Sequence, residues 1–247
     1  MNFKARADIL SGFDKRYGHV VVPVYKSPDG DGVVHEGSAI LVKTSSQYWM
    51  FTARHVSENC NGIVLASQPN VRLPGPVISH PDPIDLAYTE IPKEHVDAIL
   101  AAEMAFLPSE LIAATLDSLS PECCAFTGYP GKAVDLDGDE RTALVWPIRI
   151  FSAFAADSVV SAAGYDPSIH IGASVRIIQR QQEAFDPRGL SGGAIWRVRE
   201  NGEVKLVGIA IEYDRRCGLL IGTRIRPLIE NIIKRLAAVL ELGGSII

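Results

Sequence analysis

Cysteine is scarce in this sequence: the 247 residues include only four, Cys60, Cys123, Cys124 and Cys217. They form no CxxC pair, and two of them are adjacent, a spacing at which cysteines rarely bond each other. Neither a disulfide framework nor a cysteine-bound metal is therefore expected. We interpret the cysteines as reduced thiols of a cytoplasmic protein. The sequence predicts no metal site and no cofactor.

Long apolar runs and dense basic clusters are also missing. The N-terminal residues lack the apolar stretch of a secretory signal, and no run approaches the ~20 residues of a membrane-spanning helix. The formal net charge is −5, from 24 Lys and Arg against 29 Asp and Glu. Nucleic acid and membranes are therefore not expected as partners, and a cytoplasmic location is expected.

Short apolar and β-branched segments, separated by turn signals, fill most of the chain. The segments 38–43 and 48–53 flank a short polar turn, which is typical of a hairpin. Further segments follow, among them one at 143–154, while 92–107 contains a helical stretch. Apolar residues recur every three or four positions in 226–242, which predicts a helix with one buried face. This pattern favours an antiparallel barrel or sandwich in two β-rich halves.

We expect one domain over residues 1–247. Its parts are an N-terminal half at 19–100, a connector at 101–121, a C-terminal half at 122–225 and a C-terminal helix at 226–242. A groove between two such halves is a natural place for a substrate.

The sequence GLSGG at 189–193 is the strongest local signal for chemistry. A serine becomes a useful nucleophile when a base removes its proton and the backbone holds its hydroxyl outward. Neighbouring glycines permit a tight turn, leave room for a peptide, and can aim N–H groups at a developing oxyanion. An ordinary hairpin turn that happens to contain a serine is the alternative for this motif taken alone.

Two further residues are candidates to assist the serine. His55 follows the apolar segment 48–53, and Asp85 begins the apolar alternation at 85–91. Separately, His55 would suit a surface or capping position and Asp85 a solvated turn, with Asp82 competing for the same role. A buried carboxylate needs a partner, and the imidazole of His55 would provide one for Asp85.

Taken together, these three segments are far more specific. The sequences TARH at 52–55, DLA at 85–87 and GLSGG at 189–193 resemble the three signature blocks of the chymotrypsin-like (trypsin-like) serine proteases, in the order His, Asp, Ser. The resemblance covers about residues 19–230. The short interval between His55 and Asp85 is closer to compact bacterial Deg-type members than to secreted digestive enzymes. The resemblance implies an all-β fold of two antiparallel β-barrels.

The same resemblance implies a serine endopeptidase. Ser191 would attack the scissile carbonyl, His55 would take and return the proton, and Asp85 would orient the imidazole. The N–H groups of Gly189 and Ser191 would form the oxyanion hole. A non-catalytic scaffold with the protease fold is the alternative, and the complete set of catalytic residues argues against it. An esterase of the α/β-hydrolase type is disfavoured because its order is Ser, acid, His.

A substrate pocket is also implied, with Phe185 at its base. Phe185 offers no carboxylate to a Lys or Arg side chain, although Asp186 would if the alignment slipped by one position. Bulk at Tyr213 and Leu220 favours a small or medium apolar side chain. His170 could line the pocket, as in glutamate-selective members. The residues assigned to the pocket are Phe185, Ile211, Glu212, Tyr213 and Leu220.

Control of the protease is expected to come from outside the domain. Leu190 replaces the Asp that pairs with a freshly cut N-terminus in secreted members, so activation by N-terminal cleavage is not expected. A protease that is not activated by cleavage, and that lies in a cytoplasm, needs another means of limiting its activity. We therefore expect a regulatory protein partner besides a protein or peptide substrate. For a bacterial protein, a defence effector is one setting, inferred by analogy.

Overall fold

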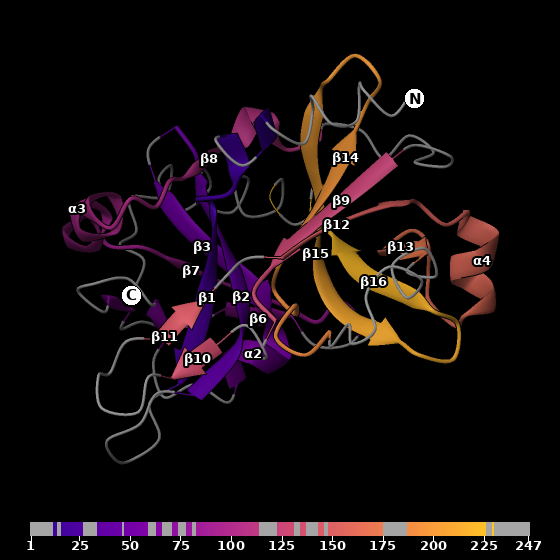
Figure 1. Cartoon of the computed structure of the whole chain (residues 1–247), viewed down its shortest axis with the longest axis horizontal. Coiled ribbons are helices and arrows are strands. Elements are labelled where there is room, and N and C mark those ends of the chain that lie inside the picture. The colour runs from indigo at the N-terminus through magenta and orange to yellow at the C-terminus, as the bar shows by residue number, and fades with distance from the viewer. Residues whose placement is uncertain are drawn as a thin grey trace, which may run out of the picture.

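Strands dominate the computed structural model, in two large sheets that lie side by side (Figure 1). Of the residues and segments discussed above, those that lie outside the described residues are Cys60, Asp82, Phe185, Asp186 and the predicted C-terminal helix apart from Ile229. The structure describes residues 12–13, 16–26, 34–45, 47–58, 63–65, 71–73, 78–80, 83–113, 123–130, 134–136, 143–145, 148–174, 187–225 and 229.

The first sheet comes from the N-terminal half of the chain and has the strand order β5-β4-β1-β2-β3-β7-β6, with β8 pairing β2. The hairpin predicted at 38–53 is β2–β3, in which Ile40 lies opposite Phe51 and Leu41 opposite Met50. Because successive side chains point to opposite faces, these two pairs enter different apolar clusters, so both faces of the hairpin are buried. The strands are β1 (Val21–Lys26), β2 (Val34–Lys43), β3 (Tyr48–Ala53), β4 (Ile63–Leu65), β5 (Val71–Leu73), β6 (Ile78–His80), β7 (Leu86–Glu90) and β8 (Leu107–Pro108).

The second sheet has the order β12-β9-β14-β15-β16-β13 and is antiparallel throughout. Its two end strands meet through a bridge between Phe154 and Ala173, which nearly closes the sheet into a barrel. The all-β fold with two barrels is thereby confirmed. The strands are β9 (Cys123–Gly128), β12 (Ile148–Ala153), β13 (His170–Ser174), β14 (Ala194–Val198), β15 (Val204–Asp214) and β16 (Leu219–Arg224).

The segment 143–154, predicted as one strand, is divided between two sheets. Its first residues form β11 (Ala143–Val145), which pairs only with β10 (Val134–Leu136) in a separate two-stranded sheet within the described part of the chain. The rest forms β12 in the second barrel. Trp146-Pro147 separates the two strands, and proline has no N–H to continue a ladder.

Helices are short and lie at the margins of the sheets (Figure 1). The helix predicted within 92–107 is α3 (Lys93–Ala101), preceded by Pro92 and packed through Val96 and Ile99. The others are α2 (Arg54–Glu58), η1 (Ser109–Leu111) and α4 (Asp157–Ala162). In the described ranges, no helix has the length and apolar character required to cross a membrane.

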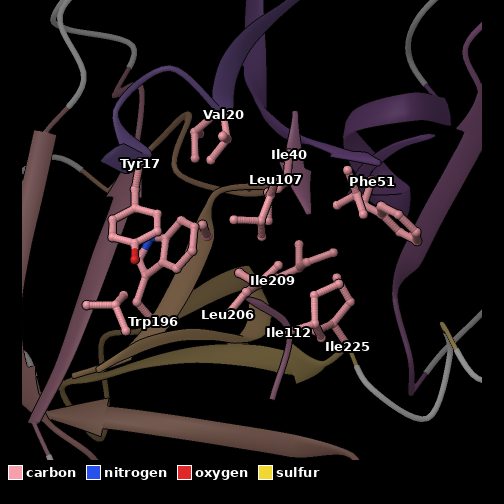
Figure 2. Packing of buried hydrophobic residues seen from close by; sticks show 14 of the residues in the cluster. Tyr17, Val20, Ile40, Phe51, Leu107, Ile112, Trp196, Leu206, Ile209 and Ile225 are labelled. Atoms are coloured by element: carbon pink, nitrogen blue, oxygen red, sulfur yellow. The ribbon is translucent and has the colours of Figure 1, made fainter. Parts of the chain in front are cut away.

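The largest apolar cluster joins the two sheets and includes residues from before the first strand (Figure 2). Tyr17 lies against Trp196 of β14, with 5.1 Å between ring centroids, and Phe13 meets the same indole edge-on at 5.7 Å. The buried indole N–H donates to Thr127 Oγ1 at 2.8 Å, so this large side chain is buried without an unsatisfied polar atom. Phe13 and Tyr17, which precede β1, are therefore part of the core.

Candidate active site

His55 and Asp85 meet because β3 and β7 are paired neighbours. The register places Ala53 opposite Leu86, so the residues just after β3 and just before β7 are adjacent. Asp85 Oδ2 lies 2.7 Å from His55 Nδ1, while Asp85 Oδ1 accepts the backbone N–H of His55 at 3.2 Å. Both carboxylate oxygens thus hold the same histidine, one through its ring and one through its main chain.

The backbone of Asp85 has an unusual conformation. Its φ is 44°, in the left-handed region that side chains other than Asn and Asp rarely adopt. The Asp85 carbonyl accepts the N–H of Arg54 at 3.2 Å, which ties this residue to the start of α2. The loop therefore presents the carboxylate to His55 in a conformation that the surrounding contacts must maintain.

The environment of His55 favours the imidazolium form. The hydrogen bond to Asp85 raises the pKa of His55 most, burial of the ring opposes this, and the charges of Asp85, Glu212 and Glu58 raise it further. His55 is nevertheless accessible, with 48% of its side-chain surface exposed against 18% for Asp85. The arrangement is that of a partly exposed imidazole whose Nδ1 is held by a carboxylate.

The segment around Ser191 forms two overlapping tight turns. Leu190 N–H donates to the Pro187 carbonyl at 3.1 Å, and Gly193 N–H donates to the Leu190 carbonyl at 2.8 Å. Gly192 has a φ of 87°, and a Cβ there would lie 1.8 Å from the Ser38 carbonyl oxygen. Only glycine fits this position, for both backbone and packing reasons. The Ser191 hydroxyl donates to the Ile211 carbonyl at 3.0 Å.

Two backbone N–H groups in the same turn have no hydrogen-bond acceptor among the described residues. In the part of the chain that the structure describes, neither the Gly189 N–H nor the Ser191 N–H donates a hydrogen bond to a protein acceptor. The two groups are two residues apart in the turn that carries the Ser191 hydroxyl, and Gly189 has a φ of 88°. They are therefore free to bind an oxygen atom of a ligand.

Ser38 of β2 holds this turn from the other sheet, and sequence reasoning gave it no functional role. Its N–H donates to the Ser191 carbonyl at 2.8 Å and its hydroxyl donates to the Gly189 carbonyl at 2.9 Å. The hydroxyl also accepts the Tyr129 N–H at 2.9 Å, and the Ser38 carbonyl accepts Thr52 Oγ1 at 2.7 Å. Ser38 is completely buried. The only sequence signal was a polar residue at the start of an apolar strand.

A cavity of about 730 Å³ brings the candidate residues together. His55, Asp85 and Ser191 all line it, so residues from both sheets share one site. Of the predicted pocket residues, Ile211, Glu212 and Tyr213 line the cavity, as does His170. Its other lining residues are Pro83, Gly164, Tyr165, Asp166, Pro187, Arg188 and Arg215.

Leu220, also assigned to the pocket from the sequence, is not among the residues that line this cavity. It is buried in an apolar cluster and pairs in register with Tyr213, which does line the cavity. Glu212 accepts a hydrogen bond from the Tyr165 hydroxyl, and burial followed by this bond raises the pKa of Tyr165. Glu212 and Tyr213 of β15 are therefore each held by a neighbour, Glu212 by the Tyr165 hydroxyl and Tyr213 by strand pairing with Leu220.

Solved serine proteases share this fold. The serine endoprotease from Yersinia pestis is 17% identical with a TM-score of 0.56, over 92% of this chain and 65% of that chain. The serine protease domain of the Sesbania mosaic virus polyprotein is 14% identical with a TM-score of 0.51, over 83% of this chain and 88% of that one. No protein-family model and no curated protein matches the sequence.

These likenesses define the chain as a protein with a chymotrypsin-like, serine-protease fold. At such low identity they show the fold alone, and the chain spans less than two thirds of the length of the Yersinia protein. The fold that the sequence motifs implied is confirmed. The closer similarity to Deg-type members stays a prediction.

Proposed function

We propose that this protein is a serine endopeptidase in which His55, Asp85 and Ser191 form the catalytic triad. The observation that carries the proposal is the cavity that all three residues line, with His55 Nδ1 held 2.7 Å from Asp85 Oδ2. The likeness of the fold to solved serine proteases supports this proposal.

The reaction would begin with a rotation of the Ser191 hydroxyl away from the Ile211 carbonyl towards His55 Nε2. His55 would accept the hydroxyl proton as Oγ attacks the carbonyl carbon of the scissile peptide bond. It would then protonate the leaving amine, which gives an acyl-enzyme and a free amino terminus. Water would repeat the sequence at the ester and regenerate Ser191. Asp85 would keep the proton on Nδ1 and stabilise the imidazolium.

The oxyanion of each tetrahedral intermediate would be bound by the N–H groups of Gly189 and Ser191. Both donors are without a protein acceptor in the described residues, and both belong to a turn that Ser38 and Gly192 fix. Removing one such donor in a related site typically costs about 10²–10³ in turnover. The contacts of Ser38 and Gly192 that fix this turn should therefore affect turnover as well as stability.

The pocket for the side chain before the scissile bond would be formed by Ile211, Glu212 and Tyr213, with Phe185 at its base. Leu220, the buried register partner of Tyr213 on β16, stays a proposed member of this pocket. This wall favours a small or medium apolar side chain. Such shape discrimination is worth about 1–3 kcal/mol per methylene.

We further propose a bacterial, cytoplasmic enzyme, controlled by a regulatory protein partner and acting as a defence effector. The sequence supports this setting through its few, irregularly spaced cysteines and through Leu190, which replaces the aspartate used in activation by N-terminal cleavage. No metal or cofactor enters the proposed reaction. A non-catalytic binding scaffold is the second candidate, favoured only if the intact triad proves inert.

Peptide hydrolysis tests the proposal. Wild-type protein and Ser191→Ala would be incubated with a diverse peptide library, and the cleavage sites read by mass spectrometry. We expect cleavage by wild type alone, after small or medium apolar residues. Equal cleavage by Ser191→Ala, or none by folded wild type with its candidate partners present, would contradict a triad-dependent peptidase.

A further inference from the structure

His170 is the buried histidine of the cavity, and its ring links two distant parts of the chain. It begins β13 in the second sheet and is only 3% exposed. Its Nε2 lies 2.7 Å from the carbonyl oxygen of Pro83, which belongs to the loop before β7 in the first sheet. Its Nδ1 lies 3.1 Å from the carbonyl oxygen of Asp166. A carbonyl oxygen only accepts, so the ring donates to Pro83 in the shorter contact.

The next carbonyl of the same loop is held by the neighbouring strand. Thr223 of β16 donates its hydroxyl to the Ile84 carbonyl, and Thr223 is the register partner of His170. Thr223 is itself 1% exposed. Two paired residues of the second barrel therefore bind two successive carbonyls immediately before Asp85.

The loop needs such restraint because Asp85 occupies the left-handed region at a φ of 44°. On its first-barrel side, the Asp85 carbonyl is bound by the Arg54 N–H at 3.2 Å. On the other side, His170 and Thr223 bind the two residues that precede it. The hydrogen bond from His55 Nδ1 depends on the carboxylate staying where these contacts place it.

We propose that His170 is a positioning residue that, with Thr223, fixes Asp85 against His55 across the interface of the two barrels. This assignment rests on the proposed function, in which Asp85 orients the catalytic imidazole. The sequence left open a second role for His170, the binding of an acidic substrate side chain. That role fits less well because both ring nitrogens already contact backbone oxygens.

The pKa of His55 provides the test, because the hydrogen bond that its Nδ1 donates to Asp85 is the main cause that raises it. The variants His170→Gln, His170→Phe and Thr223→Val would each be titrated by NMR of the His55 imidazole. His95→Gln on α3 is the control for the same substitution away from the loop. We expect the His55 pKa to fall in His170→Phe and Thr223→Val, less in His170→Gln, which retains an N–H donor, and not in His95→Gln.

Kinetics give the second readout. A displaced carboxylate should lower kcat by about ten- to a hundred-fold, the range that follows from misplacing a catalytic group by about 1 Å, and leave KM nearly unchanged. An unchanged His55 pKa in folded His170→Phe and Thr223→Val would overturn the assignment. The titration needs no substrate. A wild type that hydrolyses nothing would therefore contradict the proposed function, while the fall in pKa would still support the positioning role.

Discussion

The buried hydroxyl of Ser38 connects the first barrel to the nucleophile turn, and its removal tests how that turn is held. Ser38→Ala removes the hydrogen-bond partner of the half-buried Gly189 carbonyl and of the buried Tyr129 N–H, which lie 2.9 Å and 2.9 Å from the hydroxyl. Each buried group left unsatisfied costs about 1–3 kcal/mol. We therefore expect a loss of about 2–6 kcal/mol in the free energy of unfolding.

Urea denaturation measures this loss directly, as a lower midpoint at an unchanged slope. Ser45→Ala, at an exposed turn position, is the matched control and should stay within about 0.5 kcal/mol of wild type. The Ser38→Ala variant should also react more slowly with an active-site serine probe, because the Gly189 peptide loses its anchor. A variant as stable as Ser45→Ala and labelled at the wild-type rate would refute this account of the turn.

Two further predictions concern the base and the glycine turn. The His55 base must be neutral to accept a proton, and its pKa is raised, so kcat/KM should fall as pH decreases through a midpoint above about 6.5. Asp85→Asn should move that midpoint to lower pH and reduce the maximal kcat/KM reached at high pH. A pH–rate profile with an unmoved midpoint would contradict this. Gly192→Ala and Gly202→Ala both place a side chain at positive φ, 87° and 84°, but only the first meets another atom, at 1.8 Å. Gly202→Ala should cost about 1–2 kcal/mol on thermal denaturation, and Gly192→Ala should cost clearly more; equal losses would contradict the packing argument.

The sequence predicted those features that depend on local pattern. The β2–β3 hairpin follows from two apolar segments around a polar turn, and α3 follows from its spacing after Pro92. Once β3 and β7 are paired, the contact of His55 with Asp85 follows from the register. Tyr213 and Ile211 reach the cavity because β15 continues past the nucleophile turn.

Features that depend on distant contacts were not predictable in this way. Ser38 and Gly189 are 151 positions apart, and His170 and Pro83 are 87 positions apart, so no local pattern connects them. The helix α4 (Asp157–Ala162) is too short for a periodic signal, and its valines have weak helix propensity. Phe13 and Tyr17 pack against Trp196, which is distant in the sequence, so their place in the core depends on the folded chain.

Covalent labelling of Ser191 tests the central claim most directly. The purified protein would be treated with a fluorophosphonate, alongside Ser191→Ala and His55→Ala, and the modified peptide identified by mass spectrometry. A functional triad predicts a single adduct on Ser191 in wild type and none in either variant. A folded wild type that stays unlabelled in the presence of its candidate partners, or an adduct that persists in His55→Ala at the wild-type rate, would contradict it.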